Sequence, residues 1–181
     1  MSYAVVIPNR FPDIIQPLAE SIRKFEPDAR VLIVADNHTN DYGFERITHQ
    51  HKEFQFAKAV NLGLHHLVGL DVILLNDDCV LREPTFDRLA EIAYLYPTVG
   101  LVSPMIRGCV GNPYQRFNEI RKWWDPCETI KLVWGKTPVC FPCVYLKRSM
   151  LDRVGFLDET IKGYGFDDDE YCMRARKFGW A

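Results

Sequence analysis

Three groups of acidic side chains stand next to predicted secondary-structure elements. Asp36 follows one apolar run, Asp77 and Asp78 follow another, and the run at 167–170 leads into a predicted helix. Consecutive carboxylates repel each other, so a strand end tolerates such a pair when a partner offsets the charge. Mg²⁺ or Mn²⁺ bound to a diphosphate is one such partner, because these ions use one or two protein carboxylates plus phosphate oxygens. Nearby basic residues are the alternative partner.

Two of these groups also have simpler structural interpretations. Asp36 and Asn37 are suited to a turn or a helix cap as much as to contact with a ribose or a base edge. Each acid at 167–170 would stabilise a helix N-terminus by about 0.3–1 kcal/mol, yet four in succession after a Gly-rich loop exceed that need. One of them could act as a general base toward an acceptor hydroxyl. The ligand spacing of an EF-hand calcium loop is absent.

The elements that must position these groups alternate along the chain. Unbroken apolar runs indicate strands buried on both faces, and apolar residues at helical spacing indicate helices. The expected strands cover 4–7, 31–35, 72–75, 99–102 and 139–147, and the expected helices cover 13–25, 56–68, 84–94, 149–154 and the segment after the acidic run. This alternation predicts parallel βαβ units with right-handed crossovers, and therefore ligands at the carboxyl ends of the strands. Thr85 is a candidate cap for the third helix.

Composition narrows the class of protein. The 181 residues suffice for one domain, with 48% hydrophobic and 25% charged residues, both ordinary for a globular protein. A net charge of −2 gives no global field that favours nucleic acid or an anionic membrane. We expect no transmembrane segment, because no apolar run is long enough to cross a bilayer. The start of the chain lacks the features of a signal peptide, so a cytoplasmic location is expected.

The six cysteines are expected to be thiols in that compartment. Cys140 and Cys143 have the CxxC spacing of a zinc or redox motif. However, no second close pair completes a zinc site, and a redox motif would begin a helix, whereas this one lies within a predicted strand. We therefore expect buried structural thiols.

Five motifs occur in a fixed order over nearly the whole chain. They are Val5-Val6-Ile7-Pro8-Asn9-Arg10, Asp36-Asn37 with Thr39 and Asp41, Phe56-Ala57-Lys58-Ala59-Val60-Asn61-Leu62-Gly63, Asn76-Asp77-Asp78, and Asp167-Asp168-Asp169-Glu170 with Arg174 and Gly179-Trp180. In this order they resemble family 2 of the glycosyltransferases. The resemblance implies a GT-A-type, Rossmann-like α/β domain over residues 1–181, with a mostly parallel central sheet flanked by helices.

The resemblance also implies an activity. Family members transfer a sugar from a nucleoside-diphosphate donor (here UDP-, GDP- or dTDP-linked) to a hydroxyl of a glycan or another acceptor. Inversion at the sugar and dependence on a divalent metal, Mn²⁺ or Mg²⁺, are expected. Two other classes stay open: a non-catalytic nucleotide- or glycan-binding module of the same fold, and a nucleotidyltransferase. The second is disfavoured, because a Gly-rich phosphate loop with a basic residue is missing after the first strand.

Residue roles follow from the same resemblance. Asp78 is expected to hold the metal, Asp168 to be the catalytic base and Asp167 to support it. The residues expected at the donor nucleotide are Pro8, Asn9, Asp36, Asn37, Lys58, Asn61 and Asp77. The residues expected on the acceptor side are Tyr164, Gly165 and Phe166.

Two departures from the family pattern matter. Gln55 replaces a glycine of the third motif, so the approach to the donor is expected to differ there. Family members usually continue past the Gly-Trp pair, and some supply a metal-binding histidine there, whereas this sequence stops at Ala181. We expect either a metal held by Asp78, diphosphate and water, or a shortened form that lacks the C-terminal extension and has weak or no activity.

Overall fold

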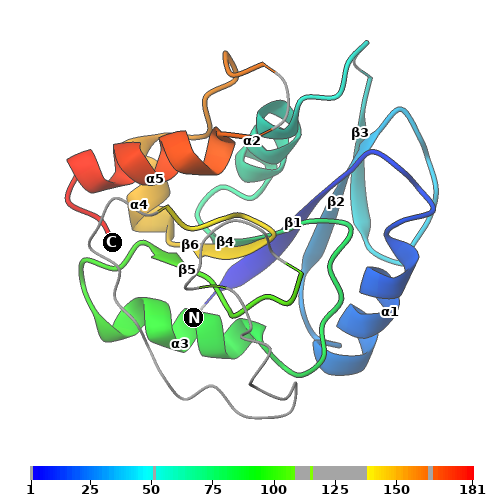
Figure 1. Cartoon of the computed structure of the whole chain (residues 1–181). Coiled ribbons are helices and arrows are strands. Elements are labelled where there is room, and N and C mark those ends of the chain that lie inside the picture. Colours follow the sequence, from blue (N-terminus) through cyan, green and yellow to red (C-terminus); the bar gives the residue numbers. More distant parts are fainter. Residues whose placement is uncertain (1, 51, 109–114, 116–137, 163–164) are drawn as a thin grey trace.

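The computed structural model describes residues 2–50, 52–108, 115, 138–162 and 165–181, and Figure 1 shows its ribbon. Its sheet has six strands in the order β3-β2-β1-β4-β6-β5. The strands are β1 (Tyr3–Asn9), β2 (Val31–Asp36), β3 (Glu45–His49), β4 (Asp71–Leu75), β5 (Leu101–Val102) and β6 (Cys143–Leu146). Neighbours from β3 to β4 pair in parallel, and β6 pairs antiparallel with both β4 and β5. The predicted fold class, a mostly parallel α/β sheet, is confirmed.

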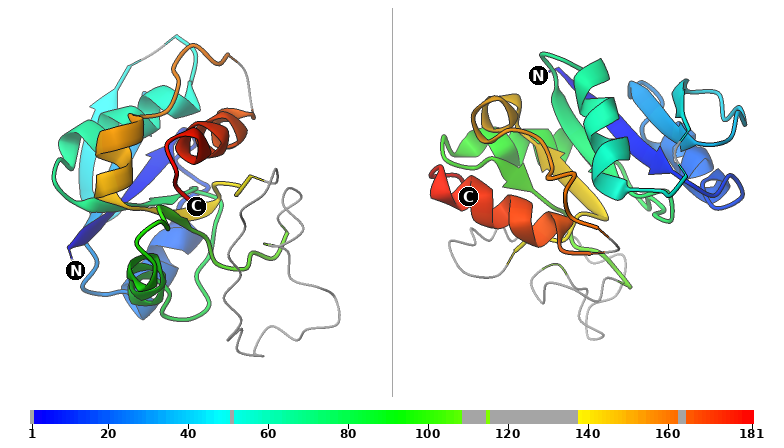
Figure 2. Two further views of the ribbon diagram at one scale, coloured as in Figure 1. Left: turned by 90° about the vertical axis from the view of Figure 1, so that its left-hand side faces the viewer. Right: turned by 90° about the horizontal axis from the view of Figure 1, so that it is seen from above.

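Helices cover both faces of the sheet. They are α1 (Gln16–Phe25), α2 (Phe56–His66), α3 (Phe86–Leu95), α4 (Arg148–Val154) and α5 (Asp167–Lys177). Figure 2 shows α2, α4 and α5 on one face, with α1 and α3 on the other. Alternate residues of β1 serve the two layers: Val6 packs in the core under α2, and Ile7 packs in the core under α1. Because both faces of the central strands are buried, their sequences are unbroken apolar runs.

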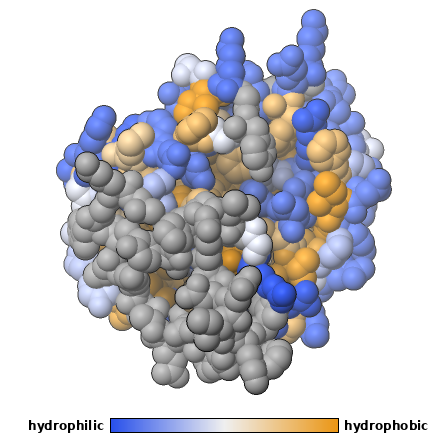
Figure 3. Space-filling model, viewed as in Figure 1, coloured by the Kyte–Doolittle hydropathy of each residue, from blue (hydrophilic) through white to orange (hydrophobic). Residues whose placement is uncertain are grey.

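One glycine sets the spacing between α2 and the sheet. A Cβ added at Gly63 would lie 2.6 Å from Cγ1 of Val6, so a larger residue would push the helix away from β1. Figure 3 shows the described residues on the face seen in Figure 1 as a mixture of hydrophilic and hydrophobic side chains, with the hydrophobic ones in small groups. Across the described ranges, no helix combines the length and apolar character needed to cross a bilayer.

The sheet topology creates a switch point between β1 and β4. The chain leaves β1 through α1 to reach β2 on one side, and it returns through α2 to β4 on the other side of β1. The loops that follow β1 and β4 therefore separate at the carboxyl edge of the sheet. In open parallel sheets a ligand-binding crevice forms at such a point.

Three strands of the structure differ from the prediction. β1 does not stop at Pro8 but continues to Asn9, and its pairing with β4 ends at Val6. Pro8 therefore lies beyond the paired stretch on that side, where a missing N–H breaks no ladder bond. β3 was missed, because this edge strand is polar and largely exposed. The strand expected over 139–147 is shorter and runs antiparallel, as β6.

The start of α3 also differs from the prediction. Thr85 occupies the N-cap position, but its side chain makes no capping hydrogen bond. Instead, the Glu26 carboxylate accepts hydrogen bonds from the backbone N–H groups of Thr85 and Phe86. The cap thus comes from the end of α1, far away in the sequence.

The described cysteines differ in burial. Cys143 and Cys172 are buried, and Cys79 and Cys140 are half-buried; Cys109 and Cys127 lie outside the described residues. Burial raises the pKa of Cys172 to about 12 and that of Cys143 well above its ordinary value. These two thiols are therefore protonated and unreactive near neutral pH.

Candidate active site

The carboxyl edge of the sheet gathers the polar residues that follow the apolar strands. Asn9 ends β1 and is fully buried, and Asn76-Asp77-Asp78 follows β4 directly. The Asn9 side chain joins the two strand ends: its Nδ2 donates to Asp77 Oδ2 at 2.8 Å and to the Phe11 carbonyl at 2.9 Å. This bond lies at the switch point, so the sequence-predicted Asn9 and Asp77 are brought together there.

The two carboxylates after β4 have different environments. Asp77 is half-buried; burial raises the pKa of its carboxyl, the charge of Asp78 raises it further, and hydrogen bonds from the Asn9 side chain and the Arg10 backbone oppose the rise. Asp78 is exposed to solvent. The pair therefore presents one carboxylate held in place and one open to a ligand.

Two amide oxygens beside this pair lack partners. Oδ1 of Asn9 and Oδ1 of Asn76 are buried, and neither has a hydrogen-bond partner among the residues described here. Buried polar atoms in native structures are nearly always paired, because leaving one unpaired costs about 1–3 kcal/mol. Two unpaired acceptors at a strand-end crevice therefore point to groups that a ligand supplies.

The oxygen atoms at this edge fit a divalent cation shared with a ligand. Within the described ranges, no group of three or more His, Cys, Asp or Glu side chains could form a metal cage. Mg²⁺ does not need one: it commonly takes one or two carboxylates and completes its shell with phosphate oxygens and water. The Asp77 and Asp78 carboxylates, with the amide oxygen of Asn76, form a hard-oxygen set of this kind.

Asp36 is placed at the end of β2 and is tied to β3. Its side chain is nearly buried; Asn37 Nδ2 donates to Oδ1 at 3.0 Å, and His49 Nδ1 lies 3.7 Å from the same oxygen. The Asn37 backbone has a φ of 57°, in the left-handed region that asparagine tolerates, and its N–H donates to the His49 carbonyl at 3.0 Å. His49 could not be predicted at this site, because the polar sequence of β3 does not indicate a strand.

The acidic run forms the first turn of α5. The sequence had instead predicted that the run precedes the helix. Asp167 is buried and Asp168 is half-buried. The two residues before the helix, Gly165 and Phe166, have φ values of 94° and 72°. A left-handed backbone is rare for a bulky residue, and the Phe166 side chain is 71% exposed. Tyr164, the third residue predicted on the acceptor side, lies outside the described residues.

A two-residue link connects this turn to the end of β4. The Asp168 carboxylate accepts a hydrogen bond from the backbone N–H of Phe141. The next carbonyl, that of Pro142, accepts from the Asn76 N–H at 2.8 Å. Burial raises the pKa of Asp168, and the charge of Asp169 adds to the rise. The first turn of α5 is thus connected to the strand end that carries Asp77 and Asp78, and the pKa of Asp168 is moved toward the working range of a general base.

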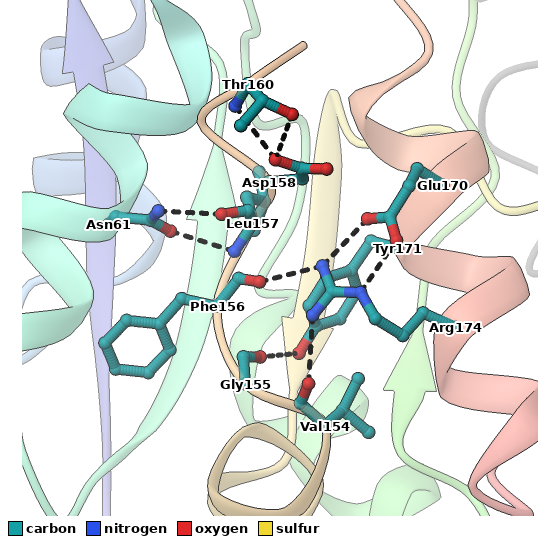
Figure 4. Close-up of polar contacts among 10 residues, drawn as sticks. All are labelled: Asn61, Val154, Gly155, Phe156, Leu157, Asp158, Thr160, Glu170, Tyr171 and Arg174. Carbon is teal, nitrogen blue, oxygen red and sulfur yellow. Dashed lines mark hydrogen bonds and ion pairs between the residues drawn. The ribbon is translucent and has the colours of Figure 1, made fainter.

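A network behind α5 fixes the helix against the loop that follows α4 (Figure 4). Arg174 donates to the carbonyls of Val154 at 2.9 Å and Phe156 at 2.8 Å, while it also pairs with Glu170 on its own helix at 2.7 Å. The Tyr171 hydroxyl donates to the Gly155 carbonyl at 2.9 Å. These contacts orient the first turn of α5, which carries Asp167 and Asp168.

Two further residues predicted at the donor, Lys58 and Asn61, are on α2. Asn61 exchanges hydrogen bonds with the Leu157 backbone at 2.9 and 3.0 Å and donates to Glu159 Oε1 at 2.9 Å, so its amide anchors the loop shown in Figure 4. Lys58 lines a shallow hollow of about 190 Å³ with His49, Leu62, His65 and Glu159. The structure thus gives Asn61 a structural contact and places Lys58 beside the end of β3.

No protein-family model and no curated protein sequence matches the chain. Solved structures do. The mannosyltransferase PcManGT from Pyrobaculum calidifontis, in complex with GDP-Man and Mn²⁺, is 21% identical with a TM-score of 0.65, over 99% of this chain and 53% of that one. TarS 1–349 from S. aureus, in complex with UDP-GlcNAc, is 16% identical with a TM-score of 0.67, over 97% of this chain and 53% of that one.

A third similar structure is GalNAc-T7 with UDP, GalNAc and Mn²⁺. It is 14% identical with a TM-score of 0.67, over 97% of this chain and 40% of that one. The chain therefore spans about half, or less, of these proteins. At such identities the likeness shows the fold, which is the GT-A fold expected from the sequence motifs.

Proposed function

We propose that the chain is a glycosyltransferase that moves a sugar from a nucleoside-diphosphate donor to an acceptor hydroxyl. The observation that carries this proposal is the hydrogen bond of Asn9 to Asp77 at the switch point, with the exposed Asp78 carboxylate next to it. The fold supports the same class, because proteins of this fold were solved with GDP-Man, with UDP-GlcNAc and with UDP.

The donor half of the site lies along β1, β2 and β4. Asp36 and Asn37 bind the base or ribose, with Pro8 and Asn9 at the adjoining strand end. Asp77 and Asp78 would hold a divalent cation, Mn²⁺ or Mg²⁺, beside the diphosphate, with Asp78 as its main ligand. When bound, such a cation offsets the charge that develops on the leaving diphosphate.

The acceptor half is the start of α5. Asp168 removes the proton from the acceptor hydroxyl, and the oxygen of that hydroxyl attacks the anomeric carbon of the donor sugar. The nucleoside diphosphate leaves from the opposite face, so a single displacement inverts the configuration. Asp167 supports the base. The Phe166 ring, exposed at the head of the helix, is placed to stack on an acceptor sugar.

The experiment is a donor and acceptor screen with stereochemical analysis. The chain is incubated with UDP-, GDP- and dTDP-sugars, Mn²⁺ and simple glycan acceptors, and released nucleoside diphosphate is measured for wild type and Asp168→Asn. We expect release with one donor, an inverted product by NMR, and loss of turnover in the variant. Retained configuration would overturn the base assignment, and nucleotide binding without turnover would indicate a non-catalytic module. Pyrophosphate release from a nucleoside triphosphate would indicate a nucleotidyltransferase.

A further inference from the structure

Arg10 stands directly beside the carboxylate pair, although no role follows for it from the motifs. It is the first residue after β1, and its backbone N–H donates to the Asp77 carboxylate. Its backbone therefore lies next to the bond between Asn9 and Asp77, and its side chain carries a positive charge.

Two aromatic rings flank the Arg10 guanidinium. Its Cζ lies 5.0 Å from the centroid of the Phe11 ring and 5.9 Å from that of Phe54. Phe54 is half-buried and packs against the core just before α2 begins, so the guanidinium lies between the end of β1 and the segment that leads into α2. Stacking on rings limits the freedom of the flat guanidinium without using any of its N–H donors.

Among the residues that the structure describes, those donors have no acceptor. Within the ranges that the structure describes, the Arg10 side chain forms no ion pair and no hydrogen bond. Other arginines differ: Arg30 pairs with Glu45 at 3.1 Å, and Arg174 pairs with Glu170 at 2.7 Å. An ordered guanidinium with unused donors at a ligand crevice fits an oxyanion, since its planar fork matches phosphate oxygens.

We propose that Arg10 binds the diphosphate of the donor directly, from the β1 side of the site. This inference rests on the proposed function, because it assigns a residue to the same donor. Two groups of residues then contribute to diphosphate binding. The carboxylates of Asp77 and Asp78 would contribute through a cation, and Arg10 contributes without one. Part of the nucleotide affinity should therefore persist when divalent cations are removed, and that part should depend on the number of phosphates.

Isothermal titration of wild type, Arg10→Ala and Arg10→Lys tests the proposal. Each protein is titrated with a nucleoside and with its mono- and diphosphate, in EDTA and in Mn²⁺. We expect Arg10→Ala to weaken diphosphate binding about 10- to 100-fold in both conditions, the range for a lost charged hydrogen bond, and to leave nucleoside binding unchanged. Arg10→Lys should fall between, because an ammonium lacks the planar fork. Arg88→Ala, which removes an exposed arginine of α3, is the matched control.

The outcomes separate the two proposals. If wild type binds none of the nucleotides, the proposed function fails. If wild type binds the diphosphate and Arg10→Ala binds it equally well, the role of Arg10 is overturned while the donor site stands. If Arg10→Ala weakens the binding of the nucleoside and of the diphosphate equally, the proposed contact with the diphosphate is also overturned, because Arg10 would then affect only the shape of the site. Phe54→Leu, which leaves Arg10 in place but removes one ring, should weaken diphosphate binding by a smaller factor.

Discussion

Two aspartates mark the two ends of β4 and have opposite surroundings. Asp71 begins the strand and is buried. Its Oδ2 accepts hydrogen bonds from the hydroxyls of Tyr94 at 2.7 Å and Tyr145 at 2.5 Å, and its Oδ1 accepts from the Arg148 N–H at 2.6 Å. Burial, followed by the hydrogen bond to Asp71, raises the pKa of Tyr94 to about 12. Both oxygens of this carboxylate have protein donors.

Asp77 follows the same strand and is less well supported. Asn9 is its side-chain donor, Asp78 lies next to it in the sequence, and buried amide oxygens nearby lack partners in the described structure. Its pKa is raised, chiefly by burial, so the fold disfavours its charged form. A carboxylate with hydrogen-bond donors to both oxygens stabilises a fold. A carboxylate with fewer donors lowers the stability of the fold, and a ligand that binds to it can offset that loss. The two ends of β4 thus separate a structural edge from a functional edge.

The largest effect should come from the first turn of α5, which the Phe141 and Pro142 backbone connects to the functional edge. Asp168→Asn keeps the size of the side chain and an oxygen that can accept from Phe141, but it cannot take a proton. We expect turnover to fall about 10²- to 10⁴-fold, the usual contribution of a general base, with the fold intact. Steady-state kinetics and circular dichroism measure the two quantities. A variant with near wild-type turnover would show that the base lies elsewhere.

The structural edge should respond in the opposite way. Asp71→Asn replaces an acceptor oxygen with an NH₂ group that cannot accept from the hydroxyls of Tyr94 and the buried Tyr145. We expect the free energy of unfolding to fall by about 1–3 kcal/mol, the cost of leaving a buried group unsatisfied. Turnover per folded molecule should stay the same. Urea unfolding followed by fluorescence checks this, and a loss of activity larger than the loss of folded protein would erase the contrast between the edges.

Asp77→Asn should raise stability, with a definite pH dependence. Because the folded pKa of Asp77 lies above its ordinary value of 3.8, the folded state binds more protons between the two values. Its stability contribution is therefore full below pH 3.8 and declines as pH rises through the folded pKa. The asparagine removes this decline, so the variant should be more stable than wild type near pH 7 and no different at lower pH. Thermal unfolding across pH 3 to 8 tests the sign, and nucleotide binding should weaken.

The backbone before α5 offers the smallest effect. Phe166 has a left-handed backbone, which costs a bulky residue about 1 kcal/mol, and its ring is largely exposed. Phe166→Gly removes the strain but adds chain entropy on unfolding, so stability should change by roughly 1 kcal/mol or less. The KM for the acceptor should rise while the KM for the donor holds. An unchanged acceptor KM would remove Phe166 from the acceptor side.

The strand ends could be predicted because continuous apolar runs give way to polar residues at fixed points. Asp36 and Asn76-Asp77-Asp78 were placed at the carboxyl edge on that basis, and the structure places them there. The antiparallel direction of β6 could not be predicted, because its connection passes through a segment without a regular pattern. β3 could not be predicted either, since an edge strand needs no apolar run.

Contacts between distant residues were also beyond the sequence. The bond between Asn9 and Asp77 joins residues 68 positions apart, and the link from Asp168 to Asn76 passes through backbone groups of Phe141 and Pro142. No local pattern encodes either contact. The sequence does show a basic residue, Arg10, directly after the first strand. Its proposed role in binding the donor, however, depends on the two rings around its guanidinium, which only the structure shows.

The most direct test of the donor site is calorimetry with and without Mn²⁺. UDP, GDP and dTDP are titrated into wild type and Asp78→Ala, with Asp71→Asn as a control at the structural edge. We predict that one nucleotide binds more tightly with Mn²⁺, that this gain disappears in Asp78→Ala, and that folded Asp71→Asn keeps it. If none of the three nucleotides binds wild type in either condition, or if Asp78→Ala keeps the full gain, the carboxyl edge of β4 is not the donor site.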